Sequence, residues 1–416
     1  MQLQNEQNFQ ITELPGGIKV ISEFIPYIES FSLGFWFKVG TRDEIKKHNG
    51  ISHFIEHMVF KGTKKRSARR ISEDIESFGG YLNAFTSKEN TCYYGRGLAK
   101  HLPKTFDVIA DMVQYPLFRN SDVKKELGVI LDELRDIEDN PEELIFDKFE
   151  EIIFEGNSLS RPIIGTEKTI SSFNSDIITD FHKKHYALPN MIISASGKVN
   201  HDELVTLTQK LIKLQSKAAK QKREAVSSKR FGEVAVSRDI AQVHCILGKK
   251  SYGYSSPERL KLNLLSTILG EGSSSRLFQS VRERNGMTYQ INTFINSYHD
   301  ISAFGVYLST NKTNANKALE ITEKEFDKIC NIRVSDRELR RVKEYMKGSM
   351  ILGLENTSNR MIRMTSNMIY HNRFIGVQEI INKIDAITAD EILELARDVF
   401  KKDSLTKLTM FSKVDA

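Results

Sequence analysis

The order of strands and helices predicted for this chain occurs twice. Alternating apolar residues from Phe31 to Val39 predict a strand with one buried face, and apolar spacings of three and four residues predict helices. In the first half we expect a strand at 31–39, a helix around 53–57, a helix at 68–78, strands at 81–86 and 91–98, and helices at 103–115 and 121–137. In the second half we expect strands at 233–237 and 241–248, helices at 257–269 and 273–283, strands at 288–296 and 301–309, and helices at 314–330 and 335–350. Corresponding elements lie roughly 207 to 214 residues apart, which indicates an internal duplication.

The length of the chain agrees with such a duplication. A chain of 416 residues fits two domains of about 200 residues each better than one core. We therefore expect an N-terminal domain over residues 1–215 and a homologous C-terminal domain over 232–416. Residues 216–231 lose the apolar periodicity and are rich in basic residues, so they are expected to form a linker. The predicted fold class is α+β, in which each domain is a mainly antiparallel sheet with helices packed on one face.

The pentapeptide His53-Phe54-Ile55-Glu56-His57 carries the residue types of a zinc hydrolase. Residues three and four apart are neighbours on a helix, so His53 and His57 can bind one metal ion while Glu56 lies beside it to polarise a water. The order inverts the commoner His-Glu-x-x-His but keeps its geometry. The structural alternative is a surface helix with two solvated histidines; chance placement of 10 His and 54 acidic residues gives roughly 0.03 such matches. The corresponding helix of the second half, around 259–265, lacks these residues, which predicts a single metal site.

One zinc ligand is missing from this pentapeptide, because a catalytic zinc has three protein ligands and an open fourth position. The helix expected at 121–137 is the best source. Its residues Glu126 and Glu133 are seven apart, about 20 degrees short of two full turns, so both flank the apolar stripe. Asp132 and Asp136 point away from that stripe and fit a solvated face better. The residues alone leave the choice between Glu126 and Glu133 open.

The composition argues against several other classes of protein. Sixty basic and 54 acidic residues describe a well-solvated surface more than a nucleic-acid footprint. The three cysteines, Cys92, Cys245 and Cys330, are widely spaced and odd in number, which indicates buried thiols in a reducing compartment. The amino terminus lacks a basic and apolar leader, and no run approaches the ~18 apolar residues of a membrane span. We therefore expect a soluble, cytoplasmic protein without a nucleic-acid partner.

Four segments, in order, resemble the inverted-zincin pitrilysin family, in particular its mitochondrial-processing-peptidase-like branch of single chains with two homologous domains. They are GISHFIEHMVFKGT, GGYLNAFTSKENT, KKELGVILDELRDIEDNPEE and GSSSRLFQSVRERNGMTY. The resemblance implies a bacterial zinc metalloendopeptidase acting on unfolded or extended peptides, with one Zn²⁺ per chain. The family's third ligand follows the second histidine by 76 residues, which implies Glu133 beside His53 and His57, with Glu126 supporting the site. Glu56 is then the general base that moves a proton from the attacking water to the leaving amine.

The resemblance also implies how substrate is bound. The strand with Asn83, Ala84 and Phe85 is similar to the edge strand on which the family lays its peptide by main-chain hydrogen bonds. Arg282 and Tyr289 match a pair that reaches from the second domain to the substrate carbonyl and the developing oxyanion. The two domains are then expected to close like a clamshell, with the metal-free C-terminal domain completing the substrate cavity.

Assembly and activity have alternatives. Resemblance to bacterial single-chain members implies a homodimer. The alternative function is a non-catalytic scaffold or substrate-binding subunit of a processing-peptidase-like complex, because the family includes partners that keep the fold and lose the metal. A third hypothesis is an active subunit that needs a different partner chain.

Overall fold

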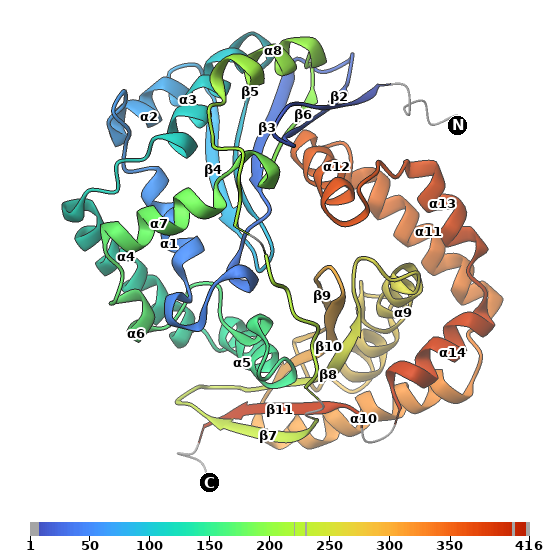
Figure 1. Cartoon of the computed structure of the whole chain (residues 1–416). Coiled ribbons are helices and arrows are strands. Elements are labelled where there is room, and N and C mark those ends of the chain that lie inside the picture. The colour runs from blue at the N-terminus through green and yellow to red at the C-terminus, as the bar shows by residue number, and fades with distance from the viewer. Residues whose placement is uncertain (1–7, 220, 229–230, 402–403, 413–416) are drawn as a thin grey trace. The chain divides into compact units, whose positions relative to one another are not determined.

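The computed structural model describes residues 8–219, 221–228, 231–401 and 404–412 (Figure 1). These residues form two compact units. The first comprises the described parts of Met1–Arg135, Arg161–Glu224 and Gly353–Gly376; the second comprises those of Asp136–Ser160, Ala225–Leu352 and Val377–Ala416. Each unit contains one sheet and the helices that cover it, which confirms the predicted α+β class with two similar domains.

The sheet of the first unit has six strands in the order β1-β2-β6-β3-β5-β4. They are β1 (Phe9–Glu13), β2 (Lys19–Phe24), β3 (Ser30–Phe37), β4 (Tyr81–Thr86), β5 (Thr91–Leu98) and β6 (Met191–Gly197). β2 and β6 run parallel, and the other neighbours run antiparallel. The sheet is therefore mixed but mainly antiparallel. Among the described residues, β4 is an edge strand with one unpaired side.

Helices cover both faces of this sheet. The helices of this unit are α1 (Ile51–Val59), α2 (Ala68–Glu76), α3 (Leu102–Gln114), most of α4 (Asn120–Asp139), α6 (Glu167–Ile170), α7 (Ser175–His185), α8 (His201–Leu211) and α12 (Thr357–His371). On one face, a Cβ at Gly95 of β5 would lie 2.6 Å from the Thr105 methyl of α3, so only glycine lets the two elements approach this closely. On the other face, Met361 of α12 packs in a buried apolar cluster with Trp36 and Ile192. Because α12 covers this second face, the structure differs from the prediction of helices on one face only.

The second unit repeats this arrangement with five strands in the order β7-β11-β8-β10-β9. They are β7 (Gly232–Ser237), β8 (Val243–Tyr252), β9 (Gln290–Ser297), β10 (Ile301–Thr310) and β11 (Thr406–Phe411). Its helices are α5 (Pro141–Ile153), α9 (Arg259–Gly270), α10 (Lys312–Asn331), α11 (Asp336–Gly353), α13 (Val377–Ala386) and α14 (Ala389–Val399). Cys245 and Leu247 of β8 face the cluster formed with α9, α10 and α14, whereas Ile246 between them faces α5. Successive residues of a strand point to opposite faces, so this sheet too is covered on both sides.

The helix expected at 273–283 is only partly present. Residues 278–283 form a π-helical segment, Phe278–Glu283, and residues 271–275 form turns and bends. The reason lies in the residues at the start of the expected helix. Gly272 has a φ of 77°, and three serines follow it. Glycine and serine are poorer helix formers than the leucine and arginine that come later.

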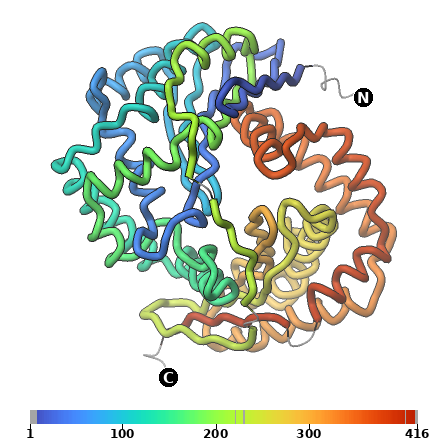
Figure 2. The backbone as a smooth tube through the Cα atoms, viewed as in Figure 1, coloured from blue at the N-terminus to red at the C-terminus, as the bar shows by residue number. Residues whose placement is uncertain are grey.

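Each half of the sequence contributes one helix to the sheet of the other unit. Helix α5 belongs to the second unit and α12 to the first. They begin at residues 141 and 357, 216 residues apart, which is close to the spacing of the duplicated elements. Figure 2 shows the orange segment of α12 beside the blue strands of the first unit. The boundaries of 1–215 and 232–416 stay a prediction about the duplicated halves, whereas each packing unit combines segments from both.

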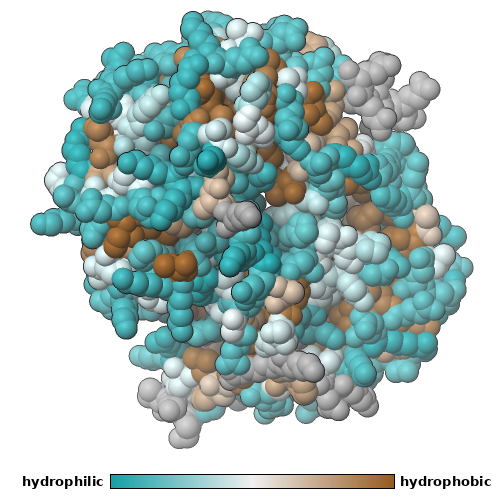
Figure 3. All heavy atoms as spheres, viewed as in Figure 1, coloured by the Kyte–Doolittle hydropathy of each residue, from teal (hydrophilic) through white to brown (hydrophobic). Residues whose placement is uncertain are grey.

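Hydrophilic residues predominate on the face drawn in Figure 3. None of the helices in the described ranges is both long enough and apolar enough to cross a membrane. The three cysteines are free; Cys92 and Cys245 are buried and Cys330 is partly buried.

Candidate metal centre

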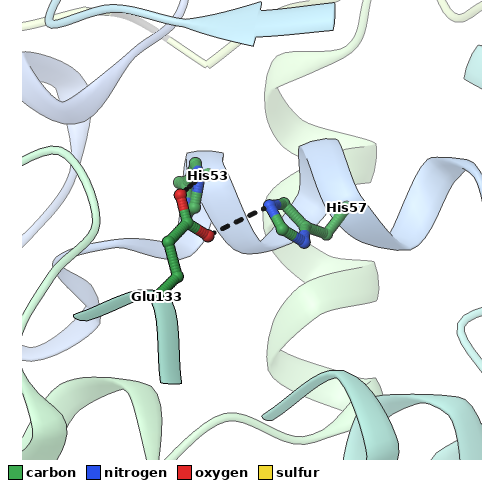
Figure 4. A group of neighbouring side chains, drawn as sticks. All are labelled: His53, His57 and Glu133. Atoms are coloured by element: carbon green, nitrogen blue, oxygen red, sulfur yellow. Dashed lines mark ion pairs between the residues drawn. The ribbon is translucent and has the colours of Figure 1, made fainter. Parts of the chain in front are cut away.

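The side chains of His53, His57 and Glu133 converge in the first unit (Figure 4). Nε2 of His53 lies 3.6 Å from Oε1 of Glu133, and Nε2 of His57 lies 3.5 Å from Oε2. One ligand atom from each residue lies within 4.8 Å of the others. Around a tetrahedral zinc with bonds of about 2.0–2.1 Å, ligand atoms are about 3.3–3.4 Å apart. The three side chains therefore fit a zinc ion with only small shifts.

Helix α1, which carries both histidines, is fixed at its start and along its apolar side. It begins after Gly50, whose φ of 94° favours glycine. The Glu44 carboxylate accepts hydrogen bonds from the backbone N–H groups of Gly50 and Ser52, each at 2.8 Å. These are donors that the first turn of a helix leaves without a backbone partner. Phe54 packs edge-on against Phe173, with ring centroids 5.4 Å apart, so the polar side of α1 is turned towards α4.

Glu126 contacts the second histidine, His57, through the ring nitrogen Nδ1. Its Oε1 lies 2.9 Å from Nδ1 of His57, and its Oε2 lies 2.5 Å from Nζ of Lys61. Burial by itself raises the pKa of Glu126, but the hydrogen bond from His57 and the ammonium of Lys61 lower it overall. When Nδ1 carries the proton that it donates to this carboxylate, the lone pair of Nε2 is left for a metal ion.

The electrostatic surroundings differ between the two histidines. Burial and the neighbouring His57 lower the pKa of His53 to about 3, so its ring is neutral near pH 7. Burial also lowers the pKa of His57, but Glu126 and Glu133 outweigh it and raise that pKa overall. A neutral imidazole beside a ring held by a carboxylate is a suitable pair of nitrogen ligands for zinc.

Glu56 accepts a hydrogen bond from Thr86, a residue that the sequence did not indicate. Oγ1 of Thr86, at the end of β4, donates a hydrogen bond of 2.6 Å to Oε2 of Glu56. Burial raises the pKa of Glu56, against the opposing effects of Thr86 and His57. A raised pKa suits a general base that works near neutral pH. The sequence feature that could have identified Thr86 is the alternation in β4, which places Thr86 on the same face as Leu82 and Ala84.

The predicted substrate-binding residues lie in the edge strand β4 but face different ways. Nδ2 of Asn83 donates to the Tyr81 hydroxyl at 2.7 Å, and its Oδ1 accepts the backbone N–H of Ala84 at 2.9 Å. Phe85 packs edge-on against Trp36, with centroids 5.4 Å apart. The strand is therefore placed as expected, and the contacts of these three residues with a substrate stay a prediction.

Arg282 and Tyr289 belong to the second unit and contact each other. The guanidinium carbon of Arg282 lies 4.7 Å from the ring centroids of both Phe278 and Tyr289. Arg282 and Tyr289 line a pocket of about 320 Å³ together with Gly270 and Asn292. Tyr289 is 80% exposed, so its hydroxyl is free to meet a ligand. The role of this pair in catalysis stays a prediction.

Comparison with known proteins gives matches over nearly the whole chain. The family model described as insulinase (peptidase family M16) matches residues 19–167, and the model described as peptidase M16 inactive domain matches residues 172–346. An uncharacterized zinc protease of Streptomyces coelicolor is 36% identical over 397 residues, 93% of this chain and 86% of that one. One from Rickettsia felis is 34% identical over 400 residues, 95% and 96% of the two chains. The crystal structure of a protease from Helicobacter pylori has the same fold, with a TM-score of 0.90 at 22% identity, covering 97% of this chain and 99% of that one.

Proposed function

Because the chain belongs to peptidase family M16, the insulinase family, we propose that it is a zinc-dependent metalloendopeptidase that hydrolyses unfolded or extended peptides. The observation that carries this proposal is the convergence of His53, His57 and Glu133, with Glu56 one helical turn from His53. Two imidazoles and one carboxylate are a donor set of catalytic zinc sites that leaves a fourth position open. A Zn²⁺ held there would supply Lewis-acid activation of a water molecule and of the peptide carbonyl.

The chain's own residues supply proton transfer and orientation. Glu56 accepts the proton of the attacking water and delivers it to the leaving amine, and Thr86 orients its carboxylate by the 2.6 Å hydrogen bond. Glu126 orients the ring of His57 by the 2.9 Å hydrogen bond to Nδ1. A positioned general base contributes about 10²–10⁴-fold to a rate, so Glu56 carries a large part of the predicted activity.

Substrate binding follows from the unpaired side of β4. A peptide that adds a strand there gains main-chain hydrogen bonds, which selects extended segments over folded ones. Asn83 meets the peptide backbone beside the metal ligands. Arg282 and Tyr289 of the C-terminal domain complete the cavity and stabilise the oxyanion, as the family resemblance implies. One Zn²⁺ per chain, a homodimer and a cytoplasmic location are further parts of this proposal, supported by the resemblance to bacterial single-chain members.

The proposal is tested with Glu56→Gln in the full chain. This variant should bind as much zinc as the wild type, because Glu56 is not a ligand, and should lose at least about 100-fold in kcat on an unstructured fluorogenic peptide. The matched control is Glu138→Gln, the same change at an exposed residue of α4. Zinc content is measured by mass spectrometry of the purified proteins. Undiminished turnover by zinc-loaded Glu56→Gln would contradict the assignment.

Metal analysis separates the peptidase from the scaffold alternative. The wild-type chain should contain about one zinc, and a chelator should abolish digestion of a denatured protein substrate until zinc is restored. A chain that folds and binds peptide but contains no zinc would support the non-catalytic subunit instead. The complete ligand set favours the peptidase.

A further inference from the structure

Arg96 is a cation beside the open edge of the first sheet. It lies in β5 directly opposite Tyr81 of β4, it is exposed, and its guanidinium carbon is 4.9 Å from the centroid of the Tyr81 ring. Arg66 and Arg70, near the start of α2, both form an ion pair with the carboxylate of Asp74. Arg96, by contrast, has no ion pair with any carboxylate in the described part of the chain. Stacking on a ring leaves the in-plane N–H groups of a guanidinium available to a ligand.

The surface around Arg96 is aromatic. Directly opposite residues of an antiparallel pair point to the same face, so Tyr81, Asn83, Tyr94 and Arg96 share one face of β4 and β5. The ring centroids of Tyr81 and Tyr94 are 6.1 Å apart, and those of Tyr94 and Phe85 are 6.3 Å apart. This face is the one opposite to α3, which Gly95 contacts. The Arg96 guanidinium therefore lies on an aromatic surface next to the edge strand β4.

A peptide strand bound to β4 comes within reach of this charge. Neighbouring strands lie about 4.8 Å apart, so an added strand lies about 10 Å from the backbone of β5. The side chain of Arg96 leans over Tyr81 towards the edge, and an acidic side chain of the added strand on the same face covers the remaining gap. Aliphatic or aromatic residues at that position would leave the charge without a partner.

The position of the acidic residue follows from the spacing along β4. Tyr81, over which Arg96 lies, and Thr86, which binds Glu56, are five residues and about 17 Å apart. Asn83, which we expect to meet the peptide beside the metal ligands, is only two residues from Tyr81. The peptide residue beside Tyr81 is therefore about two to five residues from the cleaved bond. In antiparallel pairing with β4 this residue is on the C-terminal side of that bond.

On the basis of the proposed peptidase function, we propose that Arg96 is a specificity-determining residue. It selects peptides with an aspartate or glutamate about two to five residues C-terminal to the cleaved bond. Tyr81 acts as the platform that directs the guanidinium towards the bound strand. The ion pair is partly solvated, so its effect is a preference within a broad substrate range, and salt weakens it.

Competing peptides test this inference. An unstructured peptide with one strongly preferred cleavage bond is made with Glu, Gln or Lys at each position up to eight residues on either side of the bond. Each Glu, Gln and Lys set is digested together by the zinc-loaded full chain and followed by mass spectrometry. At one position two to five residues C-terminal to the bond, the wild type should cleave the Glu peptide roughly fivefold faster than the Lys peptide, and the ratio should fall at 1 M salt.

Variants identify the residue responsible. Arg96→Gln should bring the ratio of Glu to Lys cleavage at this position close to one, and Arg96→Glu should invert it. Each ratio is measured within a single mixture, so it does not depend on the overall activity of a variant. The matched control is Arg69→Gln, which removes an arginine whose side chain is 88% exposed on α2, and should leave the ratio unchanged.

Two outcomes are separated by this design. Chelator-sensitive cleavage by the wild type with the same ratio as Arg96→Gln overturns the role of Arg96 and leaves the peptidase intact. Failure of the wild type to cleave any of the peptides overturns the proposed function, and the role of Arg96 with it.

Discussion

His57 uses its two ring nitrogens for two different carboxylates. Nδ1 lies 2.9 Å from Glu126, and Nε2 lies 3.5 Å from Glu133. Only Glu133 also approaches Nε2 of His53, at 3.6 Å. Glu126 is therefore placed to orient His57, whereas Glu133 is placed to be a metal ligand itself. The apolar pattern of α4 alone left the choice between the two glutamates open.

The hydrogen bond from His57 makes Glu126 the first residue to test. Glu126→Gln should weaken zinc binding by about 10- to 100-fold, because the amide is a weaker acceptor for Nδ1–H and leaves Lys61 without its anion. Chelator competition at fixed pH measures the affinity. The control is Asp132→Asn, which changes an exposed carboxylate of the same helix paired with Arg135. Equal zinc affinity of Glu126→Gln and the wild type would contradict a supporting role.

Among the elements, α7 shows how a buried histidine ties one helix to another. Nε2 of His182 lies 2.9 Å from the carbonyl oxygen of Val113 in α3. Burial lowers the pKa of His182 to about 4, although the hydrogen bond to Val113 opposes the shift. The ring is therefore neutral in the folded protein at pH values where it is already protonated in the unfolded chain.

The sign of the pH dependence follows from these two pKa values. The unfolded histidine titrates near 6.5 and the folded one near 4, so the unfolded state binds more protons between them. The free energy of unfolding should fall by about 2 kcal/mol from pH 7.5 to pH 5 through this residue alone. His182→Gln should remove that part of the loss, measured by urea unfolding at both pH values. The exposed His299→Gln serves as the control, and equal pH slopes for His182→Gln and the wild type would contradict the prediction.

At the scale of the whole molecule, the exchange of α5 and α12 couples each unit to the other half of the sequence. Met361 of α12 is fully buried against the first sheet, and Leu144 of α5 is buried against the second. A short segment of one duplicated half thus supplies part of the core under the strands of the other.

Truncating these two residues should loosen opposite units. Met361→Ala should cost about 2–5 kcal/mol because it leaves a cavity, and should speed amide hydrogen exchange in β3 and β6. Leu144→Ala is the mirrored control and should speed exchange in β8 and β11. Faster exchange in the second sheet on Met361→Ala, with the first unaffected, would show that the packing units are assigned wrongly.

The local parts of this fold were predictable from sequence. The limits predicted for the strands at 81–86 and 91–98 are those of β4 and β5, because alternation and the adjacent turn residues are properties of the segment itself. The spacing of His53, Glu56 and His57 places them together on one helix for the same reason. The start of the helix expected at 273–283 was less predictable, because the glycine and serines there are weak helix formers and form turns instead.

What the sequence by itself determined is the duplication, the helix that carries the two histidines, and the single half of the chain that bears them. Those features depend on periodicity and covalent spacing, which persist in any fold of the chain. The family resemblance implied Glu133 beside the two histidines, and the tertiary structure places it there. The tertiary structure alone decided that Thr86 binds Glu56, that Arg96 lies over Tyr81, and that α12 covers the first sheet. Each of these joins residues distant in sequence, and only the packing of whole elements brings them within contact distance.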